Sequence, residues 1–233
     1  MISASLTLLA TGDITLVGQV VESSNATFVV EVTSSEASSY AIYKPLAGER
    51  PLWDFEPGLY KRERAAYLLS EHLGLGLVPP TIVREDAPAG LGSLQWFVEA
   101  DQREHYFSVY DERPETHPRL KEIAVFDLLA NNTDRKSGHV LYGTDGRVWG
   151  IDHGLCFAAD FKLRTVVWDF AGEEVDPPLL AAIEPLATRI PDDLAELLTE
   201  PEVEALRARA AYIVDHPVLP HDPTGRRIPW PLV

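Results

Sequence analysis

The sequence contains one cysteine, Cys156, and no apolar run of about 18 residues. A single cysteine cannot form a disulfide within the chain, which fits the reducing conditions of a cytoplasm. Without a long apolar run, no membrane-spanning helix is expected. Residues 1–10 are mildly apolar but carry no basic residue, so a secretory signal is not expected either. The sequence therefore predicts a cytoplasmic protein.

Basic residues are also scarce. There are 20 Lys and Arg against 36 Asp and Glu, which gives a formal net charge of −16. A surface of this sign repels nucleic acid and anionic membranes, so neither is expected as a partner, and a substrate in a phospholipid bilayer is disfavoured. The chain has 233 residues, 45% of them hydrophobic, which is enough for one core or for two lobes that share a cleft.

The first half of the chain is rich in strand patterns. Residues 14–21 and 27–32 are β-rich runs joined by a polar turn, and residues 40–45 predict a third strand. Strand alternation places Lys44 on the same face as Tyr40 and Ile42. A lysine on an apolar face either pairs with an anion or extends to water.

A helix is predicted over residues 58–73, because apolar residues recur at intervals of three and four. Glu63 lies inside this apolar stripe, where a carboxylate must be paired or protonated. Lys44 is the expected partner. Two further strands are predicted over residues 77–83 and 92–99.

Two acids frame a short hairpin in the second half. A helix over residues 118–130 leads to Asp134, and two apolar runs flank Thr144-Asp145-Gly146, a strong hairpin signal. Asp152 ends the second run. Because the hairpin folds the chain back, Asp134 and Asp152 are expected at the same end of it. One acid could orient a hydroxyl while the other holds a metal, which is the arrangement that phosphoryl transfer needs.

The segments around these acids resemble the catalytic and metal loops of the kinase superfamily. Asp134-Arg135 is followed five residues after the acid by His139 (139 − 134 = 5), the interval from Asp to Asn in kinase catalytic loops. Asp152 follows after thirteen more (152 − 139 = 13), within Ile151-Asp152-His153-Gly154. The resemblance is closest to the atypical branch of phosphatidylinositol 3-/4-kinases and HipA-like kinases, in particular small actinobacterial phosphatidylinositol 3-/4-kinase-like proteins.

This resemblance implies an α+β, bilobal protein-kinase-like fold. The amino-terminal lobe, residues 1–100, would hold an antiparallel sheet, and the carboxy-terminal lobe, residues 101–233, would be small and mainly helical. ATP and Mg²⁺, or alternatively Mn²⁺, are the implied cofactors, and the acceptor would be a protein or a small molecule.

The resemblance also implies roles for individual residues. Asp134 would be the catalytic base and Lys136 would contact the transferred phosphate. Asp152 and His139 would hold the metal, while Lys44, oriented by Glu63, would bind the ATP phosphates. The turn residues Ser23, Ser24 and Asn25 would cover the phosphates, and Trp96, Phe97, Val98 and Glu99 would form the hinge at the adenine.

Three positions depart from the family pattern. His139 replaces the metal-binding Asn, Lys136 replaces the His of Asp-Arg-His, and His153 replaces the Phe of Asp-Phe-Gly. Mg²⁺ prefers oxygen ligands, whereas imidazole suits softer metals such as Mn²⁺ or Zn²⁺. A lysine two residues after the catalytic acid is itself a feature of protein kinases.

Four functions remain open at this point. The chain could be a kinase, a nucleotide-binding pseudokinase, which His139 favours, or an enzyme that transfers AMP from a flipped nucleotide. The fourth is a metal-dependent hydrolase using Asp134, His139, Asp152 and His153, although strand alternation would turn His153 away from Asp152.

The rest of the chain is less informative. Residues 100–117 are expected to be a polar linker, and residues 157–170 a substrate-facing segment with Lys162 and Arg164. Helices are predicted near residues 178–187, 191–198 and 201–214, followed by a proline-rich tail that packs on the body through Trp230.

Overall fold

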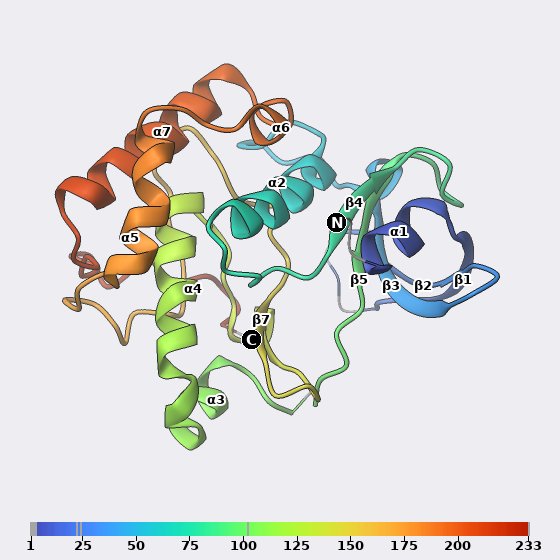
Figure 1. The fold of residues 1–233 in the computed structure, drawn as a ribbon, viewed down its shortest axis with the longest axis horizontal. Coiled ribbons are helices and arrows are strands. Elements are labelled where there is room, and N and C mark those ends of the chain that lie inside the picture. The colour runs from blue at the N-terminus through green and yellow to red at the C-terminus, as the bar shows by residue number, and fades with distance from the viewer. Residues whose placement is uncertain (1–3, 22, 24, 102, 233) are drawn as a thin grey trace.

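The computed structural model describes residues 4–21, 23, 25–101 and 103–232. It has an α+β fold in which a five-stranded antiparallel sheet lies beside a helical part (Figure 1). The strand order is β1-β2-β3-β5-β4. The strands are β1 (Asp13–Gln19), β2 (Phe28–Thr33), β3 (Ser38–Pro45), β4 (Thr81–Arg84) and β5 (Gly92–Trp96). The predicted antiparallel sheet is therefore confirmed.

All the described helices except the first surround a core that is separate from that of the sheet. The helices are α1 (Ala4–Thr11), α2 (Leu59–His72), α3 (Tyr106–Glu112), α4 (His117–Ala130), α5 (Pro177–Ile183), α6 (Asp192–Ala195) and α7 (Glu200–Asp215). Short 3-10 turns cover Leu46–Gly48, Pro114–Thr116, Ser137–His139 and Glu184–Ala187. Helix α2 lies between the sheet and the group α4, α5 and α7 (Figure 1). None of the described helices is long and apolar enough to span a bilayer.

Two large sets of buried side chains and a small one, Phe55, Leu59 and Ala158, make up the interior of the described chain. In the sheet, Val30, Val32, Ala41, Tyr43 and Leu94 pack together with α1 through Leu8 and Leu9. A larger set joins the apolar face of α2 to α4, α5 and α7. Helix α2 thus belongs to the helical core and also lies against β4 and β5, so it connects the two parts. The division of the chain at residue 100 stays a prediction.

The alternation of β3 sets the position of Lys44. Ala41 and Tyr43 are fully buried on the sheet's core face, and Tyr40, Ile42 and Lys44 lie on the other face, which is more open.

The β6 strand (Val140–Tyr142) pairs with β7 (Val148–Gly150) in the predicted hairpin, with Leu141 opposite Trp149. The hairpin returns the chain toward the end of α4.

Two expectations for the second half are wrong. Residues 100–117 are no linker, because α3 forms there, with Tyr106 and Val109 buried. His105 caps this helix: its Nδ1 accepts a hydrogen bond from the Ser108 N–H at 3.4 Å, and the Ser108 hydroxyl oxygen accepts one from the His105 N–H at 2.9 Å. Trp230 does not pack on the body, since 86% of it is exposed.

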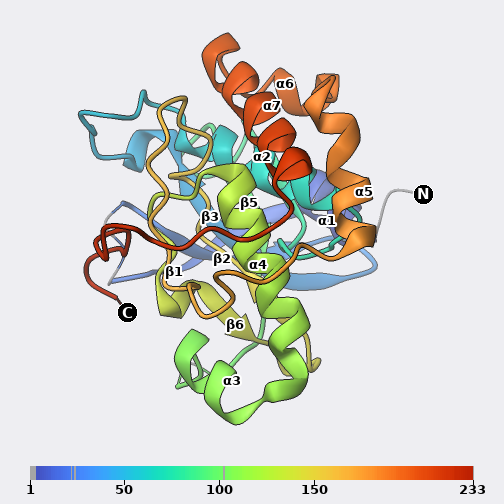
Figure 2. The same ribbon diagram turned by 90° about the vertical axis from the view of Figure 1, so that its left-hand side faces the viewer.

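The carboxy-terminal segment instead attaches through backbone groups. The Ser137 N–H donates to the Leu232 carbonyl at 2.8 Å, and the Thr165 N–H donates to the Arg227 carbonyl at 3.1 Å. Figure 2 shows this segment crossing the front of the molecule. The helix predicted at 178–187 is α5 continued by the 3-10 turn Glu184–Ala187, the one predicted at 191–198 is reduced to α6, and α7 contains the whole of the third.

Candidate active site

Three charged side chains from distant parts of the chain meet between the sheet and the helical part. The Lys44 ammonium lies 2.5 Å from Glu63 Oε1 and 2.7 Å from Asp152 Oδ1. Glu63 is 2% exposed, so its charge needs this partner. Its other oxygen, Oε2, accepts the His153 N–H at 3.0 Å. Glu63 therefore ties the strand lysine to the segment that carries Asp152.

Backbone conformation places Asp152 at this point. The residue follows β7 and has φ of +58°, in the left-handed region that Asp tolerates better than bulkier residues. Burial raises the pKa of Asp152, but the charges of Lys44 and His139 outweigh this, so its pKa lies well below the usual range. Burial likewise lowers the pKa of Lys44, and Asp152 and Glu63 together raise it above its usual value. Both groups are therefore ionised at neutral pH.

His139 approaches the same carboxylate from the 3-10 turn before β6. Its Nε2 lies 3.3 Å from Asp152 Oδ2, and its Nδ1 accepts a hydrogen bond from the Lys136 N–H at 3.4 Å. Burial lowers the pKa of His139 to about 4, against the opposing effect of Asp152. The imidazole is therefore neutral at pH 7, and because Nδ1 accepts a hydrogen bond, Nε2 carries the proton that faces Asp152 and would have to lose it to bind a metal.

Asp134 lies in the loop after α4. Its N–H donates to the Asn132 side-chain oxygen at 3.0 Å, and one carboxylate oxygen lies 3.6 Å from the Lys136 ammonium. Burial raises the pKa of Asp134 to about 6, in spite of the lowering effects of Lys136 and Arg164. A carboxylate with a pKa close to the operating pH is suited to accept a proton.

A buried network holds this loop in place. Arg135 and Asp127 have side chains that are 0% exposed, and Arg135 Nη2 lies 2.9 Å from Asp127 Oδ1. The guanidinium also donates to the Ile151 carbonyl at 2.8 Å and contacts His153 Nε2 at 2.7 Å. The Thr165 hydroxyl donates to Asp127 at 3.0 Å. The residue after Asp134 is thus anchored to α4, to the residue before Asp152 and to the following segment.

A small cavity of about 60 Å³ lies at this meeting point. Among the predicted site residues it is lined by Ser23, Asn25, Lys44, Glu63, Asp134 and Asp152. Lys136 and His139 lie beside it, each in contact with one of the two acids. Ser24 lies outside the described residues. The structure therefore brings both acids, the lysine and part of the hairpin turn to one place.

The hairpin turn is fastened to the loop after β3. The Ala26 N–H donates to the Gly48 carbonyl at 3.0 Å, and the Arg50 N–H donates to Asn25 Oδ1 at 2.8 Å. A Cβ atom at Gly48 would lie 2.5 Å from the Ala26 Cβ, so this close approach requires glycine. The Ser23 hydroxyl contacts Thr27 Oγ1 at 2.8 Å.

The predicted hinge lies apart from this cavity. Trp96 ends β5, and the Phe97 N–H donates to the Tyr40 carbonyl at 3.2 Å. The Glu99 carbonyl accepts from the Thr144 N–H at 2.8 Å. Within the described part of the chain, no backbone hydrogen bond of the Val98 N–H is seen.

Two residues of this region were not predicted from the sequence. Glu49 lines the cavity and accepts hydrogen bonds from Gly58 N–H at 2.7 Å and Tyr60 N–H at 3.2 Å, at the start of α2. No local pattern signals this contact. Asp127 could have been found, since it lies three, four and seven residues after the apolar Ala124, Ile123 and Leu120.

A hydrolase metal centre is not supported. The His153 ring contacts Arg135, whereas the Asp152 carboxylate contacts Lys44 and His139. Among the described residues, no group of three or more His, Cys, Asp or Glu side chains is arranged to hold a metal ion. A metal at Asp152 would need ligands from outside the protein, such as phosphate oxygens.

Comparison with known proteins agrees with this geometry. The family model described as phosphatidylinositol 3- and 4-kinase matches residues 58–197. Protein Rv2133c of Mycobacterium tuberculosis (strain ATCC 25618 / H37Rv) is 42% identical, with 96% of this chain and 94% of that protein covered.

Among solved structures, the chain is similar in fold to hydra Fam20 with sugar, with a TM-score of 0.59 and 14% identity over 92% of this chain and 89% of that one. The Golgi casein kinase with Mn/ADP bound gives a TM-score of 0.57 and 15% identity over 94% and 79%. The predicted kinase-like fold is therefore confirmed.

Proposed function

Because the chain belongs to the phosphatidylinositol 3- and 4-kinase family, we propose that it transfers the γ-phosphoryl group of a metal–ATP complex to a protein or small-molecule acceptor. The observation that carries this proposal is the position of the Lys44 ammonium between Glu63 and Asp152, at 2.5 and 2.7 Å. Kinases need a lysine–glutamate pair and a metal-binding aspartate together at the phosphates.

The nucleotide would lie between the sheet and Asp152. Lys44 would pair with phosphate oxygens, and the turn with Ser23, Ser24 and Asn25 would cover them. The adenine would meet the segment Trp96–Glu99, where a backbone group would hydrogen-bond the base. In these roles the lysine, the turn and the segment would each contact one part of a bound ATP.

The donor set fits a divalent metal. Asp152 is ionised, and the neutral His139 lies against its second oxygen at 3.3 Å. A bound metal would neutralise charge on the phosphates. A carboxylate and an imidazole favour Mn²⁺ more than a site made of oxygen alone does. The similarity in fold to a kinase that binds Mn and ADP supports a nucleotide and a divalent metal here.

Asp134 would act on the acceptor hydroxyl. It would take the hydroxyl proton as the acceptor oxygen bonds to the γ-phosphorus and the bond to the β–γ bridging oxygen breaks, which releases ADP. Lys136, 3.6 Å from Asp134, would pair with the transferred group. The net charge of −16 favours a dissolved acceptor over one embedded in an anionic membrane, and a cytoplasmic location remains our expectation.

Incubation with labelled ATP tests the proposal. We expect label from γ-labelled ATP to move to an acceptor, or to water as slow hydrolysis, with Mn²⁺ or Mg²⁺ present. Transfer from α-labelled ATP instead would show AMP transfer, and transfer of neither label would contradict the proposal.

A pseudokinase is the second candidate, and His139 favours it. The imidazole occupies the position of the second metal ligand and points at Asp152. Retained nucleotide binding with no transfer of either label, in Mn²⁺ as well as Mg²⁺, would support this candidate over a kinase.

The pH dependence of transfer gives a separate prediction. Because burial raises the pKa of Asp134 to about 6, kcat/KM should fall on the acid side with a midpoint near that pH, as the base becomes protonated. Lys136 lowers this pKa, so Lys136→Met should move the midpoint to higher pH. Lys61→Met, at an exposed position of α2, is the matched control and should leave it in place. If Lys136→Met does not move the acid-side midpoint of the kcat/KM profile, the assignment of Asp134 as the base is contradicted.

A further inference from the structure

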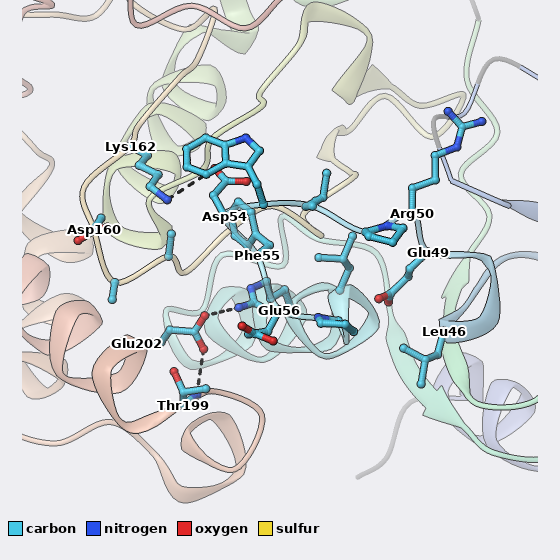
Figure 3. Close-up of a pocket in the computed structure, with 18 residues that line it drawn as sticks. Leu46, Glu49, Arg50, Asp54, Phe55, Glu56, Asp160, Lys162, Thr199 and Glu202 are labelled. Carbon is cyan, nitrogen blue, oxygen red and sulfur yellow. Dashed lines mark hydrogen bonds and ion pairs between the residues drawn. The ribbon is translucent and has the colours of Figure 1, made fainter.

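A second and larger hollow lies next to the nucleotide cavity. Its volume is about 570 Å³, and we call it the loop groove (Figure 3). It is lined by the loop 46–57 between β3 and α2, by residues 158–160 and Lys162 of the segment after Asp152, and by the start of α7. Glu49 and Leu59 line both the loop groove and the nucleotide cavity. The two hollows are thus neighbours on either side of shared side chains.

The floor of the loop groove is built around a buried ion pair. Arg62 of α2 and Glu202 of α7 form a buried ion pair, with side chains 8% and 9% exposed. The Arg62 guanidinium lies 5.2 Å from the centre of the Phe55 ring. Figure 3 shows Glu202 also accepting from the Thr199 backbone, at 2.9 Å. Side chains of α2 and α7 therefore build this floor.

The rim carries an aromatic side chain that the fold does not use. Trp53 is 91% exposed and Leu52 is 39% exposed. The Lys162 ammonium lies 5.6 Å from the centre of the Trp53 ring and 3.6 Å from the Asp54 carboxylate. An indole left this open at the mouth of a hollow is typical of a surface that binds a partner.

The charges of the lining select the partner. Five acids and three bases line the loop groove, and the pairs Arg62–Glu202 and Lys162–Asp54 neutralise two of each. Glu49 is held by N–H groups at the start of α2. The carboxylates of Glu56 and Asp160 remain, opposed by Arg50 alone. Together with the net charge of −16, this favours a cation on the partner.

We propose that the loop groove docks an extended segment of a partner protein that carries Arg or Lys beside an apolar side chain. The apolar side chain packs on Trp53 and Leu52 at the rim. The cation pairs with Glu56 or with Asp160, and its stem covers part of the Trp53 ring. Arg and aromatic anchors of this kind supply most of the energy in protein interfaces.

The same contacts couple docking to the nucleotide cavity. The Arg50 N–H holds Asn25 of the phosphate-covering turn, and Glu49 holds the start of α2, which carries Glu63. A segment that orders the loop 46–57 therefore stabilises both sides of the cavity. Linkage requires the reverse as well, so nucleotide should strengthen docking. Docking itself does not depend on phosphoryl transfer.

Titration with a defined peptide tests the proposal. The probe is a capped nonapeptide with two arginines and two leucines in a glycine–serine background, and the control peptide has glutamates in place of the arginines. Calorimetry of the full chain should show binding of the arginine peptide only. Trp53→Ala should weaken it about tenfold or more. Trp230→Ala removes an indole of similar exposure elsewhere and should have no effect.

Charge variants distinguish pairing of the peptide arginines with Glu56 and Asp160 from general attraction to the negative charge of the protein. Glu56→Gln with Asp160→Asn should weaken the arginine peptide about tenfold. Glu36→Gln with Glu85→Gln changes the net charge equally at exposed positions outside the loop groove and should change binding less than about twofold. Equal binding of both peptides, equal effects of the two charge variants, no loss with Trp53→Ala, or no binding of the arginine peptide would overturn the proposal.

Discussion

Asp134→Asn should lower kcat for γ-phosphoryl transfer about 10²- to 10⁴-fold, the range usually lost with a general base. The amide is close in size to the carboxylate but cannot accept the hydroxyl proton. Asp134 makes no contact with Lys44, which pairs with Glu63 and Asp152 instead. Nucleotide affinity should therefore change less than about threefold, a shift of under 1 kcal/mol. Single-turnover transfer of the γ-label, beside nucleotide titration, measures both quantities.

The matched control is Asp111→Asn, an exposed acid at the end of α3. It should leave kcat unchanged. An Asp134→Asn protein that transfers the label as fast as the wild type would remove Asp134 from the mechanism. Loss of nucleotide binding equal to the loss of transfer would assign it to binding instead.

Asp127→Ala should lower the free energy of unfolding by about 3–5 kcal/mol, the usual result of leaving one partner of a buried ion pair without the other. Arg135 would remain fully buried with its charge uncompensated, and Thr165 would lose its acceptor. For a chain of this size, about 1 kcal/mol corresponds to roughly 2–4 °C in Tm, so Tm should fall by about 6–20 °C.

Denaturant and thermal unfolding measure this loss. Asp111→Ala serves as the control, since an exposed acid should contribute less than about 0.5 kcal/mol. A fall of less than about 1 kcal/mol for Asp127→Ala would mean that the network around Arg135 does not anchor the catalytic loop.

Periodicity predicted the residues that lie on regular elements. The alternation of β3 placed Lys44 on one face with Tyr40 and Ile42, which the structure shows to be the more open face of the sheet, and the stripe of α2 placed Glu63 toward the core. Both positions depend on local backbone geometry alone, so the sequence contains the information needed to predict them. The Asp-Gly turn between β6 and β7 likewise fixed the return of the chain from Asp134 to Asp152.

Contacts between remote segments could not be predicted in this way. Glu49 lies in a loop, and only the folded chain brings it to the start of α2. The short helix α3 was missed because its cap is a histidine, which is not among the residues that usually signal a helix start. Trp230 was expected to be covered because it is large and apolar, yet backbone hydrogen bonds of its neighbours hold the tail.

Nucleotide binding in the presence of metal tests the central claim most directly. If Lys44, Glu63 and Asp152 form the site of a metal–ATP complex, ATP with Mn²⁺ or Mg²⁺ at about 100 times its Kd should stabilise the protein by about 2.7 kcal/mol. This corresponds to roughly 5–11 °C in Tm. Asp152→Ala should abolish the shift, and Asp111→Ala should keep it. A wild-type protein whose Tm does not change with any nucleotide and either metal would contradict the claim.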